Sequence, residues 1–244
     1  MSVEHADLTP PPRTRRRRGS LNADDILDGA FALASGSSLE GLTMPGLAAH
    51  MKVGVTSIYW YFRRKEDLLD AMTDRALERY SGELPAVTVK HWDKTLREHG
   101  RAMRRLLRDD PVLCDLVVMR TAAYGASSSQ KMMEQIESVL STLIDVGFRP
   151  DDALNTYLSI ALHTRGLAML ERQQDIDRES DIRVPGFEDK EKLPILVKLL
   201  KQGHGLGANE KTFEYGLTIA IEQAKLVLAK TERAAIARRE RRGR

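Results

Sequence analysis

The sequence contains little cysteine and no long apolar segment. Cys114 is the only cysteine among 244 residues, so no intrachain disulfide can form and a reducing compartment is expected. No apolar run approaches the roughly 18 residues that cross a bilayer, and the N-terminus carries arginines instead of the apolar core of a signal peptide. These absences predict a cytoplasmic protein without a membrane segment. Cys114 lies in the apolar run 112–119, where burial as a small hydrophobe is expected.

The sequence also lacks the common signatures of catalysis and metal binding. It contains no glycine pattern of a P-loop or a dinucleotide site, no His-Glu-x-x-His, and no second cysteine for a thiolate metal site. Its six histidines never fall at a metal-ligand spacing. We therefore predict no catalytic residues, no metal and no cofactor. A helical-bundle enzyme stays as the alternative from a different class of protein.

Aromatic residues are scarce, yet four of them are consecutive. The chain has two Trp, six Tyr and five Phe, and Tyr59–Phe62 holds four of these, followed at once by Arg63, Arg64 and Lys65. Only about half of a helix faces a core, so some of these rings must point outward beside the positive charges. Tyrosine hydroxyls and basic side chains commonly contact phosphate oxygens. The segment therefore indicates a helix that lies against nucleic acid.

The net charge of +3 conceals an uneven distribution. Residues 13–65 contain nine Lys or Arg against four Asp or Glu, and residues 230–244 contain seven against two. Residues 66–229 are mildly acidic, with 22 basic against 27 acidic side chains. This pattern is typical of a small nucleic-acid-binding module joined to a neutral or acidic body.

Hydrophobic periodicity predicts helices almost throughout the chain. In the N-terminal part, Asn22 is a good N-cap for a helix that Ser35-Gly36-Ser37 should end, and shorter helices are expected over 43–51 and 55–62 before a fourth over 65–82. The body should contain helices near 89–108, 111–119, 128–146, 150–174, 190–202 and 209–238, with an exposed loop over 175–189. Pro111 and Pro150 suit first turns, while Gly147 and Gly203 suit helix ends.

The fold class expected from this pattern is all-α. We predict a disordered basic arm over 1–20, a three-helix DNA-binding domain over 21–66, a larger helical domain over 67–238, and a basic tail over 239–244. Within the predicted DNA-binding domain, residues 43–62 have the dimensions of a helix-turn-helix, with Gly54 in the turn. In such a unit the second helix enters the major groove with its N-terminal residues at base edges.

The N-terminal third of the chain resembles the DNA-binding domain of the TetR (tetracycline repressor) family of transcription regulators. The resemblance covers about 50 residues without a gap, and its parts are in register. They are Ile26-Leu27-Asp28-Gly29-Ala30, Leu42-Thr43-Met44, Leu47-Ala48, the continuous run 53–62, and Lys65-Glu66-Asp67-Leu68-Leu69-Asp70-Ala71-Met72. The Ile-Tyr-Trp-Tyr and Leu-Leu-Asp-Ala-Met pieces are most similar to the tetracycline-repressor subgroup.

This resemblance implies a set of DNA contacts. Thr43, Tyr59, Tyr61 and Lys65 are expected at phosphates, and Val55, Thr56 and Ser57 at base edges. Arg63, from the basic run, completes the predicted set. Many relatives carry a hydroxyl or charged residue at the position of Gly54 and a polar one at that of Val55, so the operator sequence cannot be transferred from the family.

Arginine-rich ends flank the predicted helical domains. The four residues Arg15, Arg16, Arg17 and Arg18 precede the first helix, where a basic arm can follow the DNA backbone or enter the minor groove. A solvated tail that adds only nonspecific affinity is an equal alternative. The C-terminal basic tail is interpreted as solvated, because the last helix of the family ends far from DNA.

A homodimer is expected, because one short helix-turn-helix reads only a few base pairs. In the family the last two long body helices pack against their symmetry mates, and the matching segments here are about 150–174 and 209–230. Two apolar stripes could serve this interface or equally the core of one chain: Leu154, Leu158, Ala161, Arg165, Ala168 and Met169, and Phe213, Leu217, Ala220, Ile221 and Ala224.

Family members usually hold a small molecule in the body. The residues predicted to line such an effector pocket are His99, Met103, Met119, Tyr124, Met132, His163 and Arg165, although each of them could also be ordinary core. Arg165 is unusual in an apolar stripe, and three interpretations stay open: a partner across the dimer, an anionic ligand, or a side chain that reaches out to solvent. No match to a tetracycline–magnesium site is found.

Together these features predict a homodimeric, ligand-responsive transcription regulator. It should act as a repressor that binds a palindromic operator in double-stranded DNA and is released by a small-molecule effector. A ligand-independent architectural DNA-binding protein is the alternative, and it would show no effector-linked change in DNA affinity.

Overall fold

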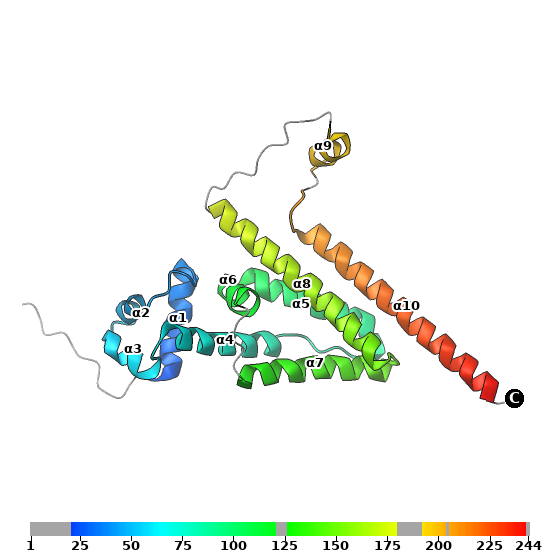
Figure 1. The fold of residues 1–244 in the computed structure, drawn as a ribbon, viewed down its shortest axis with the longest axis horizontal. Coiled ribbons are helices and arrows are strands. Elements are labelled where there is room, and N and C mark those ends of the chain that lie inside the picture. Colours follow the sequence, from blue (N-terminus) through cyan, green and yellow to red (C-terminus); the bar gives the residue numbers. More distant parts are fainter. Residues whose placement is uncertain (1–20, 121–125, 180–191, 204, 243–244) are drawn as a thin grey trace, which may run out of the picture.

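The computed structural model describes residues 21–120, 126–179, 192–203 and 205–242 (Figure 1). Over these ranges the regular structure is helical and contains no strand, which confirms the all-α prediction. The elements are α1 (Ala23–Ser37), α2 (Met44–His50), α3 (Val55–Tyr61), α4 (Lys65–Gly82), η1 (Val89–His91), α5 (Trp92–Asp109), α6 (Pro111–Cys114), η2 (Asp115–Met119), α7 (Ala126–Val146), α8 (Pro150–Glu179), α9 (Pro194–Lys201) and α10 (Glu210–Arg242).

Helices α1, α2 and α3 form a small head at one end of the molecule (Figure 1). Asn22 caps α1 as predicted: its side chain accepts from the amide of Asp25 at 2.7 Å, and the Asp25 carboxylate accepts from the amide of Asn22 at 3.1 Å. One fully buried residue from each helix, Ile26, Leu47 and Ile58, meets in the core of the head. Each helix thus contributes one apolar face to a shared core.

The C-terminal end of α1 falls in the predicted Ser35-Gly36-Ser37 segment. The helix ends at Ser37, and its C-cap Ser38 has a φ of 153°, which is incompatible with continued helix. Within the last turn the hydroxyls of Ser35 and Ser37 donate to the carbonyls of Phe31 and Leu33, each at 2.9 Å.

Helix α4 leaves the head and runs into the body (Figure 1). Its buried residues are divided between the two parts: Leu68, near its start, packs near the head, and Tyr80, near its end, lies in the body. On its surface Arg75 donates to Asp24 at 2.8 Å and to Asp28 at 2.6 Å, both on α1. The same helix therefore belongs to both cores and is fastened to the head by ion pairs.

The body packs α4, α5, α7 and α8 around one core, with α10 laid along α8 and α5. Gly100 of α5 permits the close approach of two neighbours, because a Cβ there would lie 3.0 Å from Ile160 and 3.1 Å from Leu217. Gly147, with a φ of +119°, ends α7, and Pro150 opens α8, as predicted. Cys114 is buried as predicted, and burial raises the pKa of its thiol to about 11.

Helices α8 and α10 are longer than the sequence pattern predicted. Residues 175–179 continue α8 instead of opening the expected loop, and α10 extends to Arg242, into the segment expected to be a basic tail. The exposed side of a long helix needs no apolar periodicity, so the end of the apolar pattern is not the end of the helix. Residues 1–20, 180–191 and 243–244 of the predicted arm, loop and tail lie outside the described residues.

Candidate nucleic-acid interface and effector pocket

The turn between α2 and α3 is built as a helix-turn-helix. Thr43 caps α2 by accepting from the amide of Gly46 at 3.1 Å, and Lys52 takes a left-handed φ of 56° in the turn. Gly54 precedes α3 without a side-chain cap, which leaves the first amides of α3 exposed. Ile58 and Phe62 point into the core of the head and fix the orientation of α3.

The opposite face of α3 is exposed and carries the residues predicted to meet bases. Val55, Thr56 and Ser57 are all exposed in the first turn. Tyr59 follows Val55 by four residues, and Trp60 follows Thr56 by four, so both extend this face. Trp60 is 80% exposed and was not among the predicted contacts; its signal was its place in a run of four aromatics, where one ring had to lack a core.

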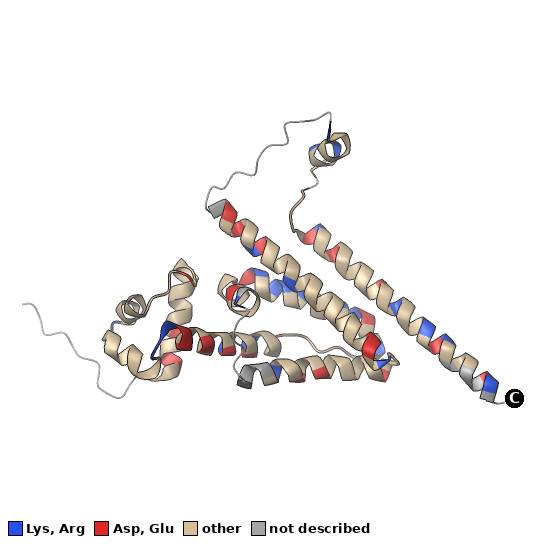
Figure 2. Ribbon diagram, in the orientation of Figure 1, with Lys and Arg blue, Asp and Glu red and all other residues tan. Residues whose placement is uncertain are grey.

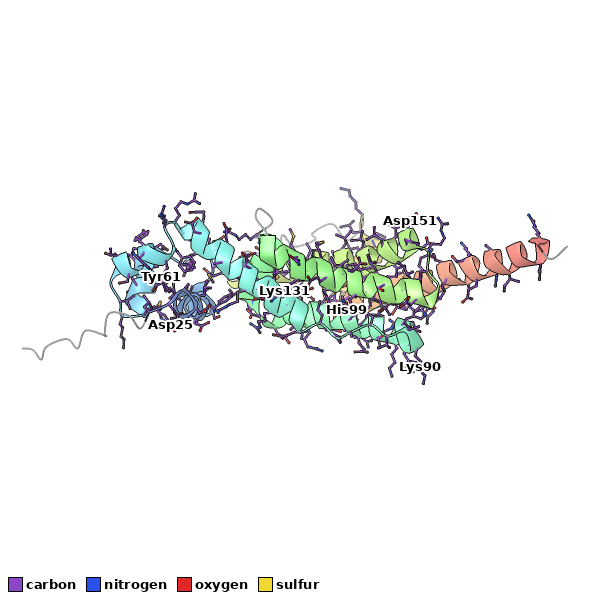
Figure 3. The ribbon with its side chains drawn as sticks, turned by 90° about the horizontal axis from the view of Figure 1, so that it is seen from below. Asp25, Tyr61, Lys90, His99, Lys131 and Asp151 are labelled. Carbon is purple, nitrogen blue, oxygen red and sulfur yellow. The ribbon has the colours of Figure 1, made fainter. Side chains whose placement is uncertain are left out.

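Two of the predicted phosphate-contacting residues already have partners in the head. The hydroxyl of Tyr61 donates to the carbonyl of Leu21 at 2.5 Å, and Nζ of Lys65 donates to the carbonyl of Glu40 at 3.3 Å. Tyr61 lies at the outer surface of the head (Figure 3). Arg63 is exposed, and no hydrogen bond or ion pair to another described residue holds it.

The predicted basic arm lies outside the described residues, but its junction with the head is described. Leu21 is the first described residue, and its carbonyl is the acceptor for Tyr61 at the C-terminal end of α3. Leu21, which follows the predicted arm with Arg15, Arg16, Arg17 and Arg18 in the sequence, therefore lies beside the C-terminal end of α3.

In the body, four of the predicted pocket residues come from the helices that surround the core. His99 and Met103 on α5 are fully buried, Met132 on α7 is 8% exposed, and Arg165 on α8 is partly buried. His99 sits within the body (Figure 3), where its Nδ1 lies 2.8 Å from the carbonyl of Pro85 and burial lowers the pKa of the ring. Nη2 of Arg165 lies 3.7 Å from the sulfur of Met132.

The other three predicted pocket residues are placed differently. His163 is on the side of α8 that faces α10, with Nε2 3.0 Å from the carbonyl of Phe213 and its ring stacked on that of Phe213. Gly216 provides room for this ring, since a Cβ there would lie 2.2 Å from it. Tyr124 lies outside the described residues, and Met119 ends η2 without a described side chain.

Several buried polar atoms around the body core have no hydrogen-bond partner. They include the Tyr80 hydroxyl on α4, Nε2 of His99 on α5, and Oγ1 of Thr164 and Nε of Arg165 on α8. Buried polar groups in folded proteins are usually paired, so these atoms differ from the rest of the core. Tyr80 was not among the predicted pocket residues, because tyrosine at a helical core spacing gives no separate signal.

Two other arginines of the body, Arg104 and Arg172, are paired with carboxylates. Arg104 donates to both oxygens of Glu171 at 2.7 and 3.1 Å, also pairs with Glu210, and lies 4.8 Å over the ring of Phe213. Arg172 donates to Asp115 at 2.8 and 2.9 Å. These pairs join α5, α8, α10 and η2 into one unit.

Helices α8 and α10 each expose an apolar face whose middle carries few charges (Figure 2). The exposed apolar residues are Leu154, Leu158, Leu162, Met169 and Leu170 on α8, and Tyr215, Ile219 and Leu226 on α10. Of the two stripes found in the sequence, the one on α10 is largely core, because Phe213, Leu217, Ile221 and Ala224 are buried within the chain.

Metal-binding clusters and membrane-spanning helices are absent from the described part of the chain. No three His, Cys, Asp or Glu side chains there are grouped to hold a metal ion. None of the helices described is long and apolar enough to cross a membrane.

Comparison with known proteins places both parts of the chain in one family. Residues 26–72 match the model of bacterial regulatory proteins of the tetR family, and residues 84–225 match that of the tetracycline repressor-like C-terminal domain. The HTH-type transcriptional repressor Rv1353c of Mycobacterium tuberculosis is 41% identical over 233 residues, covering 93% of this chain and 89% of that protein. The class E tetracycline repressor protein of Escherichia coli is 30% identical over 156 residues, covering 63% and 69%.

Solved structures agree on the fold. The structure of the Streptomyces coelicolor TetR family protein ActR in complex with actinorhodin has a TM-score of 0.61 at 22% identity, covering 84% of this chain and 97% of that one. The resemblance seen in the helix-turn-helix residues is thus confirmed, and it extends through the body. The chain belongs to the TetR family of bacterial regulatory proteins, and it is a DNA-binding regulator of transcription rather than an enzyme.

Proposed function

We propose that the protein is a homodimeric, ligand-responsive repressor that binds a palindromic operator and is released by a small-molecule effector. The observation that carries the proposal is the exposed face of α3, held rigidly by Ile58 and Phe62 and occupied by small side chains and an outward tryptophan. A repressor among the relatives, and a bound small molecule in a protein of the same fold, support the two halves of the proposal.

For the DNA contacts we assign residues 21–66 as the reading head. Val55 suits a thymine methyl, and Thr56 and Ser57 suit hydrogen bonds to base edges at the N-terminal end of α3. Trp60, one turn further along, would pack against the sugar-phosphate edge of the groove. Thr43, Tyr59 and Arg63 would contact phosphates on either side.

Lys65 and Tyr61 differ in the number of hydrogen-bond donors that remain available for DNA. Lys65 has three N–H donors and uses one on Glu40, so two stay available for phosphate. Tyr61 has a single donor and uses it on Leu21. We therefore propose a direct phosphate contact for Lys65 and, for Tyr61, mainly the role of fixing where the arm with Arg15, Arg16, Arg17 and Arg18 meets the DNA.

For the dimer we propose the exposed apolar faces of α8 and α10. On α8 the spacing of Leu154, Leu158 and Leu162 is four residues, and on α10 Tyr215 and Ile219 share the same spacing. Side chains at this spacing form a single stripe, and two such stripes per chain can bury each other in a four-helix arrangement about a two-fold axis. The interface therefore falls within the segments 150–174 and 209–230, but not on the stripe that begins at Phe213.

For the effector we propose the interior of the body near His99, Met103, Met132 and Arg165. The unpartnered polar atoms there supply directional contacts, and the methionines supply an adaptable apolar wall. By linkage, an effector that releases DNA must itself bind the DNA-bound form more weakly by the same factor.

The test is selection of bound sequences from a pool of random duplexes at several salt concentrations, with the full chain and with Trp60→Ala. A palindrome with half-sites about one helical turn apart is expected for the natural chain, and a lower yield of the same palindrome for the folded variant. Retention without sequence preference, and with a steep loss on adding salt, would instead favour an architectural DNA-binding protein. No retention at all would refute DNA binding.

A further inference from the structure

The guanidinium of Arg165 lacks the carboxylate partner that Arg104 and Arg172 of the body have. Arg104 and Arg172 each contact a carboxylate through two hydrogen bonds. Arg165 is partly buried and forms no ion pair with a carboxylate of the described residues; its Nε is buried without a hydrogen-bond partner, and Nη2 lies 3.7 Å from the sulfur of Met132. Withdrawing part of a charged group from water without a partner is costly, so the enclosed Nε needs an explanation.

Reaching out to solvent does not account for the whole Arg165 side chain. A side chain that does so keeps its charged end in water, whereas Nε of this partly buried guanidinium is enclosed and Nη2 lies 3.7 Å from the sulfur of Met132. Of the three interpretations that the sequence left open for this residue, this geometry favours two: a ligand or a residue of a second copy of the chain.

Three further helices bring complementary groups to the same place. Tyr80 on α4 is 2% exposed and its buried hydroxyl has no hydrogen-bond partner, and the nearby charge of Arg165 opposes the rise in its pKa that burial causes. Tyr157 on α8 lies under the same charge, and its ring is 6.3 Å from that of His99 on α5, whose Nε2 is also unpartnered. Met132 on α7 also contacts Arg165, with its sulfur 3.7 Å from Nη2.

We propose that this cluster is an anion-binding subsite, in which Arg165 and the Tyr80 hydroxyl bind the carboxylate of an effector whose remaining body is aromatic or otherwise apolar. The inference rests on the proposed function, because it names the chemical class of the effector. A guanidinium offers paired N–H donors that match a carboxylate, and a phenol adds one more donor. The walls of Met103, Met132 and Tyr157 are apolar, which favours an organic acid over a small hydrated ion.

The experiment uses a panel of aromatic acids, each with its methyl ester: benzoic, 1-naphthoic, 2-naphthoic and 9-anthroic acid. Thermal unfolding of the full chain is measured with each compound, for the natural protein, Arg165→Met and Tyr80→Phe. Arg105→Met is the matched control, because Arg105 is an exposed arginine of α5 whose loss changes the net charge equally. A ligand that binds only the folded state raises the unfolding temperature.

At least one acid is expected to protect the natural protein and Arg105→Met more than its ester does. In Arg165→Met the affinity for that acid should fall at least tenfold and the advantage over the ester should vanish, while Tyr80→Phe should give a smaller loss. The proposal is overturned by equal binding of acid and ester to the natural protein, or by a panel in which no acid protects it.

Stability without any ligand separates a ligand site from a contact with a second copy. Because Arg165 has no partner in the chain, Arg165→Met should unfold at the same or a higher temperature than the natural protein. A fall of several degrees would mean that a carboxylate of the partner subunit already pairs with Arg165, and the anion subsite would be refuted. Operator binding is measured in parallel without ligand: its absence from the natural protein refutes the proposed function, whereas the unfolding data still decide the subsite.

Discussion

Arg63 and Thr56 are both exposed on the head, but we expect them to contact different parts of the DNA. Arg63 has no described partner and follows α3, whereas Thr56 stands in its first turn. Arg63→Gln should weaken binding to all duplexes and reduce the slope of log affinity against log salt by about 1, because one phosphate contact is lost. Thr56→Ala should leave that slope unchanged and relax the preference at one base pair of each half-site. Titrations of both variants against operator and random duplex at three salt concentrations test this.

Arg105→Gln is the control for that pair, since it removes the same charge from α5, outside the helix-turn-helix. Its salt slope should equal that of the natural protein. An unchanged slope for Arg63→Gln would remove Arg63 from the phosphate contacts.

His99 gives the protein a dependence of stability on pH. Burial lowers the pKa of the ring, although its hydrogen-bonded contact with the Pro85 carbonyl opposes this. With a lowered folded-state pKa, the unfolded chain takes up the proton first as pH falls below about 6.5, so that stability present above this pH is lost below it. The unfolding temperature should therefore fall between pH 7.5 and pH 5.5, and it should fall less in His99→Gln.

The exposed His91 supplies the comparison for His99. His91→Gln should retain the full pH dependence of the natural protein, because His91 is exposed on the surface and takes no part in the buried core. Equal slopes for His99→Gln and the natural protein would assign the acid sensitivity to other groups.

At the scale of elements, the ion pairs of Arg104 hold three helices together. The Arg104 side chain is 6% exposed and that of Glu171 is 13% exposed, so both charges are withdrawn from water. Glu171→Gln should destabilise the fold by about 3–5 kcal/mol, because it leaves a buried guanidinium with one partner fewer. Denaturant unfolding measures this. Glu98→Gln breaks the exposed pair with Arg101 and should cost less than about 1 kcal/mol.

Most elements could be predicted from local signals, and their ends were the least certain. Asn22, Pro111, Pro150 and Gly147 act through their own backbone or side chain, so their roles were visible in the sequence. The C-terminal ends of α8 and α10 were not, because the exposed last turns of a long helix need no apolar periodicity.

The candidate sites divide in the same way. The exposed face of α3 could be predicted, since four consecutive aromatics cannot all be buried in one helix. The interior cluster could be predicted only in part: Arg165 was unusual in its stripe, but Tyr80 joins it from 85 positions away along the chain. Likewise the stripe at Phe213 was compatible with core or interface, and the choice depends on which neighbour covers it.

At the scale of the whole molecule, α4 connects the DNA-binding head with the proposed effector site in the body. This helix carries Arg75, which binds α1, and Asp70, which accepts from Arg120 of the body at 2.5 Å. Tyr80 of the proposed anion subsite is on the same helix. A ligand that shifts Tyr80 therefore acts on an element that is packed into the head, and a change in the spacing of two heads is the physical route by which it can alter DNA affinity.

Dimerisation is the condition for that route, and the exposed apolar faces make it testable. Leu162 on α8 and Ile219 on α10 are 66% and 53% exposed, so a carboxylate at either position disturbs nothing inside the chain. In the dimer the same carboxylate would be buried against an apolar surface. Leu162→Asp with Ile219→Asp should therefore give a folded monomer by sedimentation velocity, with the helical circular dichroism of the natural protein and a loss of at least 100-fold in operator affinity, as two half-sites can no longer be bound together.

Ile195→Asp on α9 controls for surface charge alone, because Ile195 is 76% exposed and lies outside these faces. It should sediment as the natural dimer and bind operator normally. If the double variant stays dimeric, the two-fold contact must be made elsewhere on the molecule. If it is monomeric yet binds the operator with natural affinity, a single head suffices, and the release of DNA by a change in head spacing is ruled out, because a monomer has no such spacing to change.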